Sequence, residues 1–286
     1  NSAGKVSVET VAAILRRAVS EGVTFLDTAR AYQESEKTVS RAVEIAGCGE
    51  DVFISTKIEI PGNLADYKPD DLRKAAVDSL EISREQLGFS HIDAVMLHRP
   101  EHRTAGGGVI WEHLRDEKES GRIGLLGVSI GAGPWEALEC LEDTTVDVMQ
   151  IPFNAWDRRW ENVLDIAADL GVVVVNRSTY LQGLLVMTEE QAETKIGTAA
   201  EYVRKWSALG DRLEIPTKEL ALRFVLGENR IKTTLVGVDS LEQFEENLAV
   251  LKKGGLSSDD RSAVLETMAG VPDPILNPAL WPTLAT

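Results

Sequence analysis

Short apolar runs alternate along the chain with longer segments in which apolar residues recur every three or four positions. The short runs predict buried strands, and the longer periodic segments predict amphipathic helices. We expect strands at residues 24–27, 52–58, 92–98, 123–129, 147–153, 172–176 and 233–238. We expect helices at residues 8–19, 36–46, 69–87, 109–120, 134–141, 160–170, 189–209, 216–226 and from residue 240 onward, with a further short helix in the tail.

Local signals mark several helix ends. Ser7 can cap the first helix, and Gly22 can close the turn that follows it. Ser240 and Gln243 have the spacing of a capping box at the start of the helix after the last strand. Residues 172–176 are almost all valine, which is typical of a strand buried on both faces of a parallel sheet.

The regular alternation of strands and helices fits two parallel architectures, a doubly wound sheet and an (α/β)8 barrel. A doubly wound nucleotide-binding sheet carries a glycine fingerprint after an early strand, and this sequence has none there. We therefore expect an (α/β)8 TIM barrel that forms a single domain over residues 1–286. Residues 255–286 are expected to form a C-terminal tail over the barrel.

The expected strands number seven, one fewer than such a barrel contains. Residues 1–6 are too short and polar to supply the first strand, which is therefore missing from the sequence given. Two explanations stay open. The chain is trimmed at its N-terminus, or the barrel is open or closed in an unusual way.

The composition narrows the class of protein. The chain has 30 lysines and arginines against 46 aspartates and glutamates, and its formal net charge of −16 disfavours nucleic-acid and anionic-membrane partners. Cys48 and Cys140 lack the spacing of a metal site or a redox pair. No apolar run approaches the roughly twenty residues of a membrane span, and the N-terminus has no basic-then-apolar signal. We expect a soluble protein of the reducing cytoplasm.

Four side chains of complementary chemistry stand at or just after the ends of the first three strands. Asp27 ends the first strand, Lys57 lies near the end of the second, and His98 ends the third. Tyr32 follows Asp27 by five residues, in the loop after the first strand. Because the carboxyl ends of parallel barrel strands meet at one rim, we expect the four side chains to converge there.

These four residue types suit protonation of an oxygen while a hydride is delivered. A phenol, with an ordinary pKa of about 10, is a weak acid at neutral pH, and a neighbouring ammonium lowers that pKa. A carboxylate keeps the lysine charged, and an imidazole can donate a hydrogen bond to a carbonyl oxygen. Each residue alone has an ordinary structural interpretation, as a turn cap, a solvent-reaching lysine, a rim histidine or a loop aromatic. Their convergence carries the prediction.

A metal site is the competing interpretation of the histidines. His98 and His102 have HxxxH spacing, but Pro100 keeps the segment from being a helix that would present both rings on one face. A metal-dependent barrel hydrolase would also need paired histidine and carboxylate ligands at the strand ends, and these are missing. We expect no metal.

The motifs GVTFLDTARAYQESE at residues 22–36, STK at residues 55–57 and LHRP at residues 97–100 resemble those of the aldo-keto reductase superfamily, in the family's order and spacing. The resemblance extends over residues 4–251. It implies that Tyr32 is the general acid and base, and that Lys57 lowers its pKa. It also implies that Asp27 pairs with Lys57 and that His98 orients the substrate carbonyl.

The resemblance also implies a nicotinamide cofactor bound in extended form across the barrel mouth. Three positions match the motifs at the nicotinamide carboxamide: Ser129, Gln150 and Asn154. Residues 176–185 match the loop that clasps the pyrophosphate and include Arg177, Ser178 and Gly183. Residues 237–247 match the adenosine-phosphate end and include Gly237, Ser240, Gln243 and Asn247. The helix N-terminus at Ser240 is a natural anion site.

The sequence departs from the family pattern near the cofactor. Gln33 replaces the glycine after the tyrosine, Arg177 replaces a stacking aromatic residue, and Ile130 replaces an asparagine. Gly237 and Gln243 stand where the family usually has bases for the 2′-phosphate of NADP, amid the acids of residues 239–246. The family default is NADP, while the local charge leaves NAD open.

The expected function is reduction of an aldehyde or ketone by NAD(P)H, or oxidation of the corresponding alcohol or aldose, with Tyr32 as general acid/base. The alternative is a nicotinamide-binding sensor or regulatory subunit with little turnover. We expect a small-molecule substrate, no nucleic acid and no membrane, and place Trp281 over the substrate pocket. The sequence gives neither the substrate nor the oligomeric state.

Overall fold

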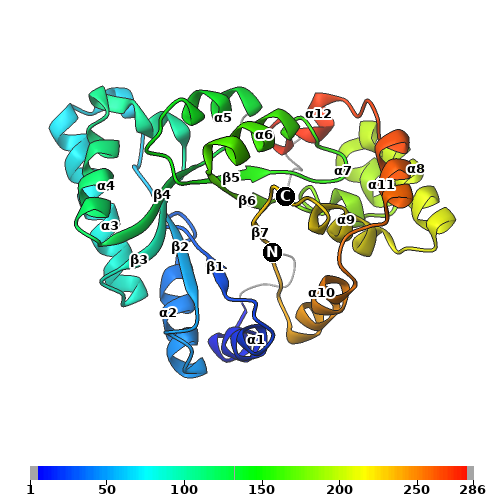
Figure 1. The fold of residues 1–286 in the computed structure, drawn as a ribbon, viewed down its shortest axis with the longest axis horizontal. Helices are drawn as coiled ribbons and strands as arrows, with labels where there is room; N and C mark the ends of the chain where they lie inside the picture. The colour runs from blue at the N-terminus through cyan, green and yellow to red at the C-terminus, as the bar shows by residue number, and fades with distance from the viewer. Residues whose placement is uncertain (1–5, 132, 282–286) are drawn as a thin grey trace. The chain divides into compact units, whose positions relative to one another are not determined.

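The computed structural model describes residues 6–131 and 133–281. Helices and strands alternate along the chain (Figure 1). The strands are β1 (Phe25–Asp27), β2 (Phe53–Ile58), β3 (Ile92–Leu97), β4 (Ile123–Ser129), β5 (Val148–Pro152), β6 (Val173–Arg177) and β7 (Thr233–Thr234). The α-helices are α1 (Val8–Ser20), α2 (Ser35–Ala46), α3 (Pro69–Leu87), α4 (Val109–Glu119), α5 (Pro134–Leu141), α6 (Glu161–Leu170), α7 (Glu189–Ile196), α8 (Ala200–Leu213), α9 (Thr217–Leu226), α10 (Leu241–Lys253), α11 (Ser258–Thr267) and α12 (Asp273–Leu276).

The described strands form one seven-stranded sheet in sequence order, from β1 to β7. The pairs β1–β2, β2–β3, β3–β4, β4–β5 and β6–β7 are parallel. A doubly wound sheet would reverse its strand order at a switch point, and this order has no reversal. The topology is therefore that of an α/β barrel, and within residues 6–131 and 133–281 no strand precedes α1.

The chain divides into two compact units. The first comprises Asn1–Gln150, Ile166–Val173 and Gly237–Phe244, and the second comprises Ile151–Asp165, Val174–Val236 and Glu245–Thr286. In the first unit α1 packs against α2, α2 against α3 and α3 against α4 (Figure 1). The single domain expected from the sequence stays a prediction.

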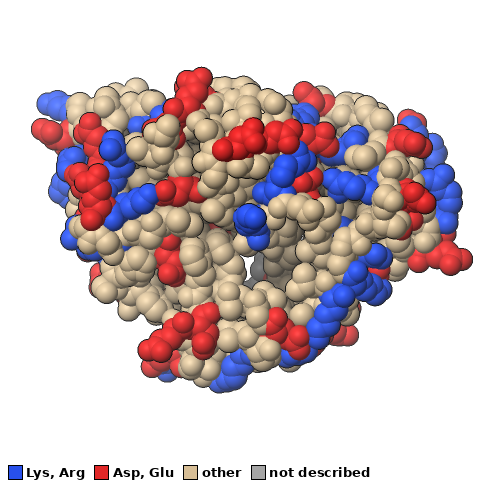
Figure 2. All heavy atoms as spheres, in the orientation of Figure 1, with Lys and Arg blue, Asp and Glu red and all other residues tan. Residues whose placement is uncertain are grey.

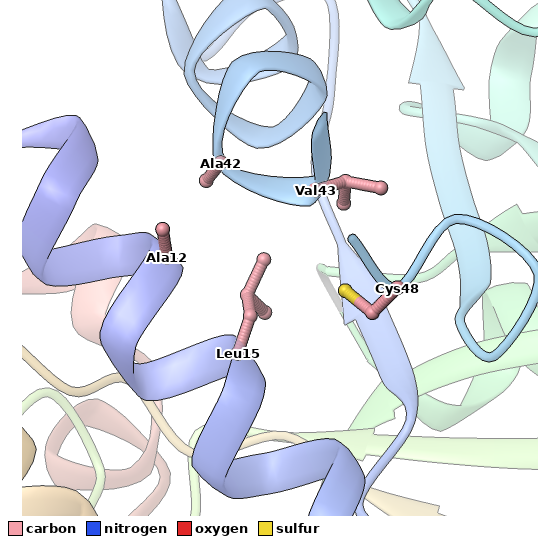
Figure 3. Packing of buried hydrophobic residues seen from close by; sticks show 5 residues of the cluster. All are labelled: Ala12, Leu15, Ala42, Val43 and Cys48. Atoms are coloured by element: carbon pink, nitrogen blue, oxygen red, sulfur yellow. The ribbon is translucent and has the colours of Figure 1, made fainter. Parts of the chain in front are cut away.

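The first unit has a small apolar core between α1 and α2. Ala12 and Leu15 of α1 face Ala42 and Val43 of α2, and Cys48 closes the cluster (Figure 3). Leu26 of β1 packs against it as a partly buried side chain, among others. Burial raises the pKa of the Cys48 thiol, so this cysteine is an apolar core residue rather than a reactive one. This core fixes the position of β1 and of the loop that leaves it.

Three sequence predictions need correction. The last strand was expected over residues 233–238, but β7 comprises Thr233 and Thr234 alone, which pair with Val175 and Asn176 of β6. The helix expected at residues 189–209 breaks into α7 and α8, since Ile196 leaves the helical region and a short 3-10 turn begins at Gly197. At the start of α10, Gln243 accepts from the N–H of Asp239 rather than from that of Ser240.

Charged side chains of both signs lie next to one another on the face drawn in Figure 2. Many carboxylates are paired, including Asp78 with Lys74 and Glu246 with Lys218. Exposed pairs of this kind contribute about 0–1 kcal/mol each, so they shape the local charge more than the stability. Across the described part of the chain, the helices are too short or too polar for any of them to cross a membrane.

Candidate active site

Asp27 and Lys57 form a buried ion pair at the ends of the first two strands. Nζ of Lys57, a fully buried side chain, donates to Oδ2 of Asp27 at 2.6 Å and to the carbonyl of Thr28 at 3.0 Å. The parallel register sets this meeting, because Asp27 pairs with Ser55, two residues before Lys57. A buried ammonium is tolerated only when it is paired and hydrogen-bonded, and both conditions hold here.

Tyr32 and His98 complete the group. The two rings meet edge to face, with centroids 5.6 Å apart and an interplanar angle of 86°. Nζ of Lys57 lies 5.3 Å from the centroid of the Tyr32 ring. Tyr32 is 45% exposed, so its phenol is accessible to a substrate. The structure thus brings together the four side chains that the sequence placed at one rim.

His98 is neutral at physiological pH. Burial and the nearby ammonium of Lys57 lower the pKa of His98 from its ordinary value of 6.5. Nδ1 of His98 lies 3.2 Å from Oε2 of Glu59, whose charge opposes this shift. In its Nε2-protonated tautomer the neutral ring can donate a hydrogen bond to an oxygen.

Two residues expected at the cofactor carboxamide are connected directly to this group. Nε2 of Gln150 donates to Oδ1 of Asp27 at 2.9 Å, and the hydroxyl of Ser129 donates to Oε1 of Gln150 at 3.3 Å. Ser55 makes a longer hydrogen bond of 3.4 Å to the same Asp27 oxygen. Gln150 and Ser129 are buried. A continuous chain of hydrogen bonds therefore runs from β4 through β5 to the aspartate.

The loop at residues 178–183, in the second unit, has an unusual backbone. Ser178, Leu181 and Gln182 have φ angles of +63°, +45° and +52°, and Gly183 has +86°. Positive φ is costly for residues other than glycine, and several such residues in one loop are typical of a functional segment. Asn154 holds the start of this loop, because its Nδ2 donates to the carbonyl of Ser178 at 3.2 Å.

Asn154 and Arg177 are engaged within the second unit. Oδ1 of Asn154 accepts from the N–H groups of Trp156 and Asp157, so its amide shapes a turn as well as the loop. Nη1 of Arg177, the last residue of β6, donates to the hydroxyl of Ser178 at 3.1 Å. The structure therefore places both residues as supports of the loop.

Two polar atoms of the second unit carry unused hydrogen-bonding capacity. The hydroxyl of Tyr180 and Oδ1 of Asn247 are buried and have no hydrogen-bond partner among residues 6–131 and 133–281. Burial, together with the charge of Glu246, raises the pKa of Tyr180 to about 12, so this phenol stays protonated. Buried polar atoms are normally satisfied, and these two fit contacts to a bound polar molecule.

A hydrogen-bonded turn forms at the start of α10, where the sequence analysis expects an anion site. The hydroxyl of Ser240 accepts from the N–H of Gln243 at 3.2 Å, and Oε1 of Gln243 accepts from the N–H of Asp239 at 2.8 Å. Gly237 lies just before this turn, with open space where a Cβ would be. The amide oxygen of Gln243 is thus occupied by its own turn.

No metal centre is found in the part of the chain that the structure describes, where no three or more histidine, cysteine or acidic side chains are grouped for a metal ion. His102 is fully buried, and neither of its ring nitrogens has a hydrogen-bond partner within the described residues. Burial and the charge of Arg99 lower the pKa of His102 to about 4. It is therefore a neutral core histidine.

Trp281 lies in the second unit. Its indole nitrogen donates to the carbonyl of Ile275 at 3.0 Å, and Nζ of Lys195 lies 5.3 Å from the centroid of one of its rings. These contacts hold the indole between the tail and α7. Its expected place over the substrate pocket stays a prediction.

Sequence reasoning missed a second charged group, behind the tyrosine loop. Glu36 is fully buried and is bonded to Arg30 and to Thr56, the residue before Lys57. A signal was available. Glu36, Val39 and Val43 are spaced at i, i+3 and i+7 on α2, so an acid occupies the apolar face of that helix.

A parallel sheet in barrel order thus carries an acid, a phenol, an amine and an imidazole grouped at its strand ends. The profile of the Aldo/keto reductase family matches residues 1–267, and the chain belongs to this family. The prediction of an NAD(P)-dependent aldo-keto reductase is thereby confirmed at the level of the family.

Individual relatives are more distant. The chain is 29% identical over 202 residues to the aldo-keto reductase YhdN of Bacillus subtilis, an alignment that spans 65% of this chain and 56% of that relative's length. It is 27% identical over 264 residues to the NADH-specific methylglyoxal reductase of Escherichia coli, spanning 80% of this chain and 79% of the relative. The holo form of aldo-keto reductase AKR11C1 from Bacillus halodurans shares its fold, with a TM-score of 0.70, 21% identity and coverage of 93% and 89% of the two chains. This neighbour confirms the predicted TIM-barrel fold.

Proposed function

We propose that the chain reduces an aldehyde or ketone at the expense of NAD(P)H, and oxidises the corresponding alcohol in reverse, with Tyr32 as general acid/base. The observation that carries the proposal is the convergence of Tyr32, Lys57, Asp27 and His98 at the strand ends. A single one of these residues would have an ordinary structural explanation. Their joint geometry supplies a proton donor, a charge that supports it and a hydrogen-bond donor for a carbonyl.

The residues divide the work of carbonyl reduction. When bound, the nicotinamide supplies the hydride. Tyr32 donates its phenolic proton to the oxygen, and the ammonium of Lys57, held by Asp27, stabilises the phenolate that remains. The neutral ring of His98 donates a hydrogen bond to the same oxygen, which orients the carbonyl and supports its developing charge.

The second unit carries groups that fit the phosphate and adenine parts of a dinucleotide. The positive φ angles at residues 178–183 are compatible with backbone N–H groups turned toward an anion. The unsatisfied Oδ1 of Asn247 suits an exocyclic amine such as that of adenine. Arg177, Ser178 and Gly183 would hold the pyrophosphate, and Ser129 with Gln150 the carboxamide.

We further propose that NADH binds at least as tightly as NADPH. The 2′-phosphate of NADPH would meet the acidic segment at residues 239–246, where the oxygen of Gln243 is occupied by Asp239 and Glu246 is paired with Lys218. A dianion near several carboxylates is disfavoured. The NADH specificity in the name of the Escherichia coli relative supports the same direction.

The Tyr32→Phe variant tests the proposal. We expect reduction of a small aldehyde panel, methylglyoxal and 4-nitrobenzaldehyde, to fall by about a thousandfold or more, since the proton donor is lost. Binding of NADH and NADPH, followed in parallel by quenching of tryptophan fluorescence, should stay within about threefold of the wild-type protein, because no contact of the phosphate loop changes. Unchanged turnover in the variant would refute Tyr32 as the acid.

The same titrations address the alternative of a cofactor-binding sensor. The complete set of four converging side chains does not favour it, because a sensor needs no proton donor. Tight cofactor binding by the wild-type chain with no turnover on either aldehyde would revive the sensor. Binding of neither cofactor would overturn both functions.

A further inference from the structure

The loop that carries Tyr32 is tied down by a buried carboxylate. Glu36, in the first turn of α2, has a fully inaccessible side chain. Its Oε1 accepts a hydrogen bond of 2.7 Å from the hydroxyl of Thr56, and its Oε2 accepts one from the guanidinium of Arg30. Because Thr56 precedes Lys57 on β2, one carboxylate joins the tyrosine loop, the helix after it and the lysine strand.

Arg30 extends this connection to α3 and to the residue after the tyrosine. Its Nη1 also donates to Oε1 of Gln86 at 2.6 Å, and its Nη2 donates to the carbonyl of Gln33 at 3.4 Å. The backbone N–H of Arg30 donates to the carbonyl of Lys57 at 2.9 Å. Arg30 lies two residues before Tyr32, and its side chain bonds to the backbone of Gln33, one residue after Tyr32. The arginine therefore connects the two sides of the tyrosine.

The backbone around Tyr32 needs such support. Gln33 has a φ of +52°, a conformation that costs a residue with a Cβ about 1–2 kcal/mol. The N–H of Tyr32 donates to the carbonyl of Ala29, and the carbonyl of Tyr32 accepts from the N–H of Ser35, so the tyrosine lies in a tight turn. A strained turn persists only where its surroundings over-determine it, and the guanidinium on the Gln33 carbonyl is one such restraint.

We propose that Glu36, acting through Arg30 and Thr56, is a positioning residue that holds Tyr32 at the distance from Lys57 and His98 that proton transfer requires. The proposal rests on the proposed function of Tyr32 and adds residues that do not touch the reacting atoms. Displacement of a reacting group by about 1 Å can reduce a rate about a hundredfold. The loss of Glu36 should therefore lower turnover without weakening cofactor binding.

The Glu36→Gln variant is the main test, because the amide keeps the size of the side chain and removes its charge. With NADH and methylglyoxal as probes, we expect kcat to fall by about tenfold to a hundredfold. The KM for methylglyoxal and the Kd for NADH should stay within about threefold. Thr56→Val removes a single hydrogen bond and should lower kcat by about threefold to tenfold. If Glu36→Gln does not fold, Thr56→Val serves as the test of the positioning role.

A second substitution separates positioning from mere stability. Gln33→Gly should be added to the Glu36→Gln or Thr56→Val variant. The double variant should have a kcat at least about threefold higher than the single variant, since glycine adopts the same turn without strain. The matched control is Glu117→Gln, which removes a buried carboxylate bonded to Arg84 and Arg122 rather than to Arg30 or Thr56. It should lower the Tm while leaving kcat per folded molecule unchanged.

The outcomes are distinguishable from failure of the proposed function. If Tyr32→Phe retains activity, the function fails and this inference with it. If Tyr32→Phe is inactive but Glu36→Gln and Thr56→Val match the wild-type kcat, only the positioning role is overturned. Equal losses of kcat, cofactor binding and Tm in the Glu36 and Glu117 variants, with no rescue by Gln33→Gly, would show a structural role alone and would also overturn it.

Discussion

Two strained loops, one in each unit, are held by contacts that differ in burial. In the loop at residues 28–36, Gln33 alone among the non-glycine residues has positive φ, and charged groups hold that loop through Arg30 and Glu36. In the loop at residues 178–183, Ser178, Leu181 and Gln182 all have positive φ, and hydrogen bonds from Asn154, Arg177 and Lys195 hold it beside buried leucines. A fully buried carboxylate holds the first loop, whereas the hydrogen bonds that hold the second are partly buried or exposed.

The difference matches what each loop is proposed to do. A proton donor must keep its place to a fraction of an ångström during every turnover, and a network whose donors and acceptors are all used provides that rigidity. A loop that binds and releases a large cofactor needs spare hydrogen-bonding capacity, as Tyr180 of this loop has. The comparison predicts that damage to the first loop lowers turnover and that damage to the second lowers cofactor affinity.

After Tyr32→Phe, replacement of Lys57 by methionine should have the largest effect. We expect kcat to fall by about a hundredfold, because the phenolate loses its stabilising charge. The pH at which alcohol oxidation rises should move up by about one unit for the same reason. The pH below which the rate of reduction falls should also rise, because the ammonium of Lys57 helps to hold the pKa of His98 low. Steady-state rates across a range of pH check both limbs.

Lys118→Met provides the matched control, since it removes a lysine paired with Asp147 in the same unit. It should lower stability slightly and leave both limbs of the pH profile in place. A Lys57→Met protein whose pH profile does not move would take Lys57 out of its proposed role. The acidity of Tyr32 in the first loop would then not depend on the charge of Lys57.

The meeting of Asp27, Lys57 and His98, with Tyr32 in the first loop, was predictable because the signals are local. Asp27, Lys57 and His98 each end an apolar run, and parallel pairing alone brings such ends together. The hydrogen bond from Gln150 to Asp27 was not predictable, because it joins β5 to β1 across 123 residues of sequence. The break at Gly197 was missed because the apolar period continues through it, although glycine itself was a warning.

The strain was predictable only in part. Gln33 stands where the family has glycine, and this departure marked the position in the sequence. The φ of +52° at Gln33 explains why glycine suits that position. At Ser178, Leu181 and Gln182 no residue type announced positive φ, because tertiary contacts impose it. Buried networks such as that of Glu36 depend on the same contacts, although an acid on an apolar helix face is a usable sign.

Replacement of Asn154 by alanine should have an intermediate effect, confined to the second loop. Its Nδ2 no longer donates to the Ser178 carbonyl, and the turn at Trp156 and Asp157 loses its acceptor. We expect the Kd for NADH to rise by about tenfold, while kcat at saturating cofactor stays within about threefold. Fluorescence titration and steady-state kinetics give the two numbers.

Asn277→Ala is the control, because Asn277 also accepts from a backbone N–H, that of Ala279, in the same unit. It should leave the Kd unchanged. A fall in kcat for Asn154→Ala as large as that for Glu36→Gln, with no change in Kd, would abolish the distinction between the loops.

A glycine substitution at one strained residue of each loop should have the smallest effect of these changes, and the effect is on the free energy of unfolding. It tests backbone strain most directly. Gln33→Gly relieves a positive φ, and its gain is offset by the greater flexibility of glycine in the unfolded chain. We expect a net stabilisation of about 0.5–1 kcal/mol. Ser178→Gly relieves the same strain but also removes the hydroxyl that accepts from Arg177, so its net change should be near zero.

Urea denaturation of the two variants beside the wild-type protein measures this difference directly. Equal stabilisation by both glycines would mean that the Arg177 contact contributes nothing to the second loop. Destabilisation by Gln33→Gly would mean that the turn after Tyr32 is not strained, and that the bonds from Arg30 and Glu36 serve the packing of α2 instead of the position of the tyrosine. The sign of this small effect therefore decides whether strain belongs in the account of the first loop at all.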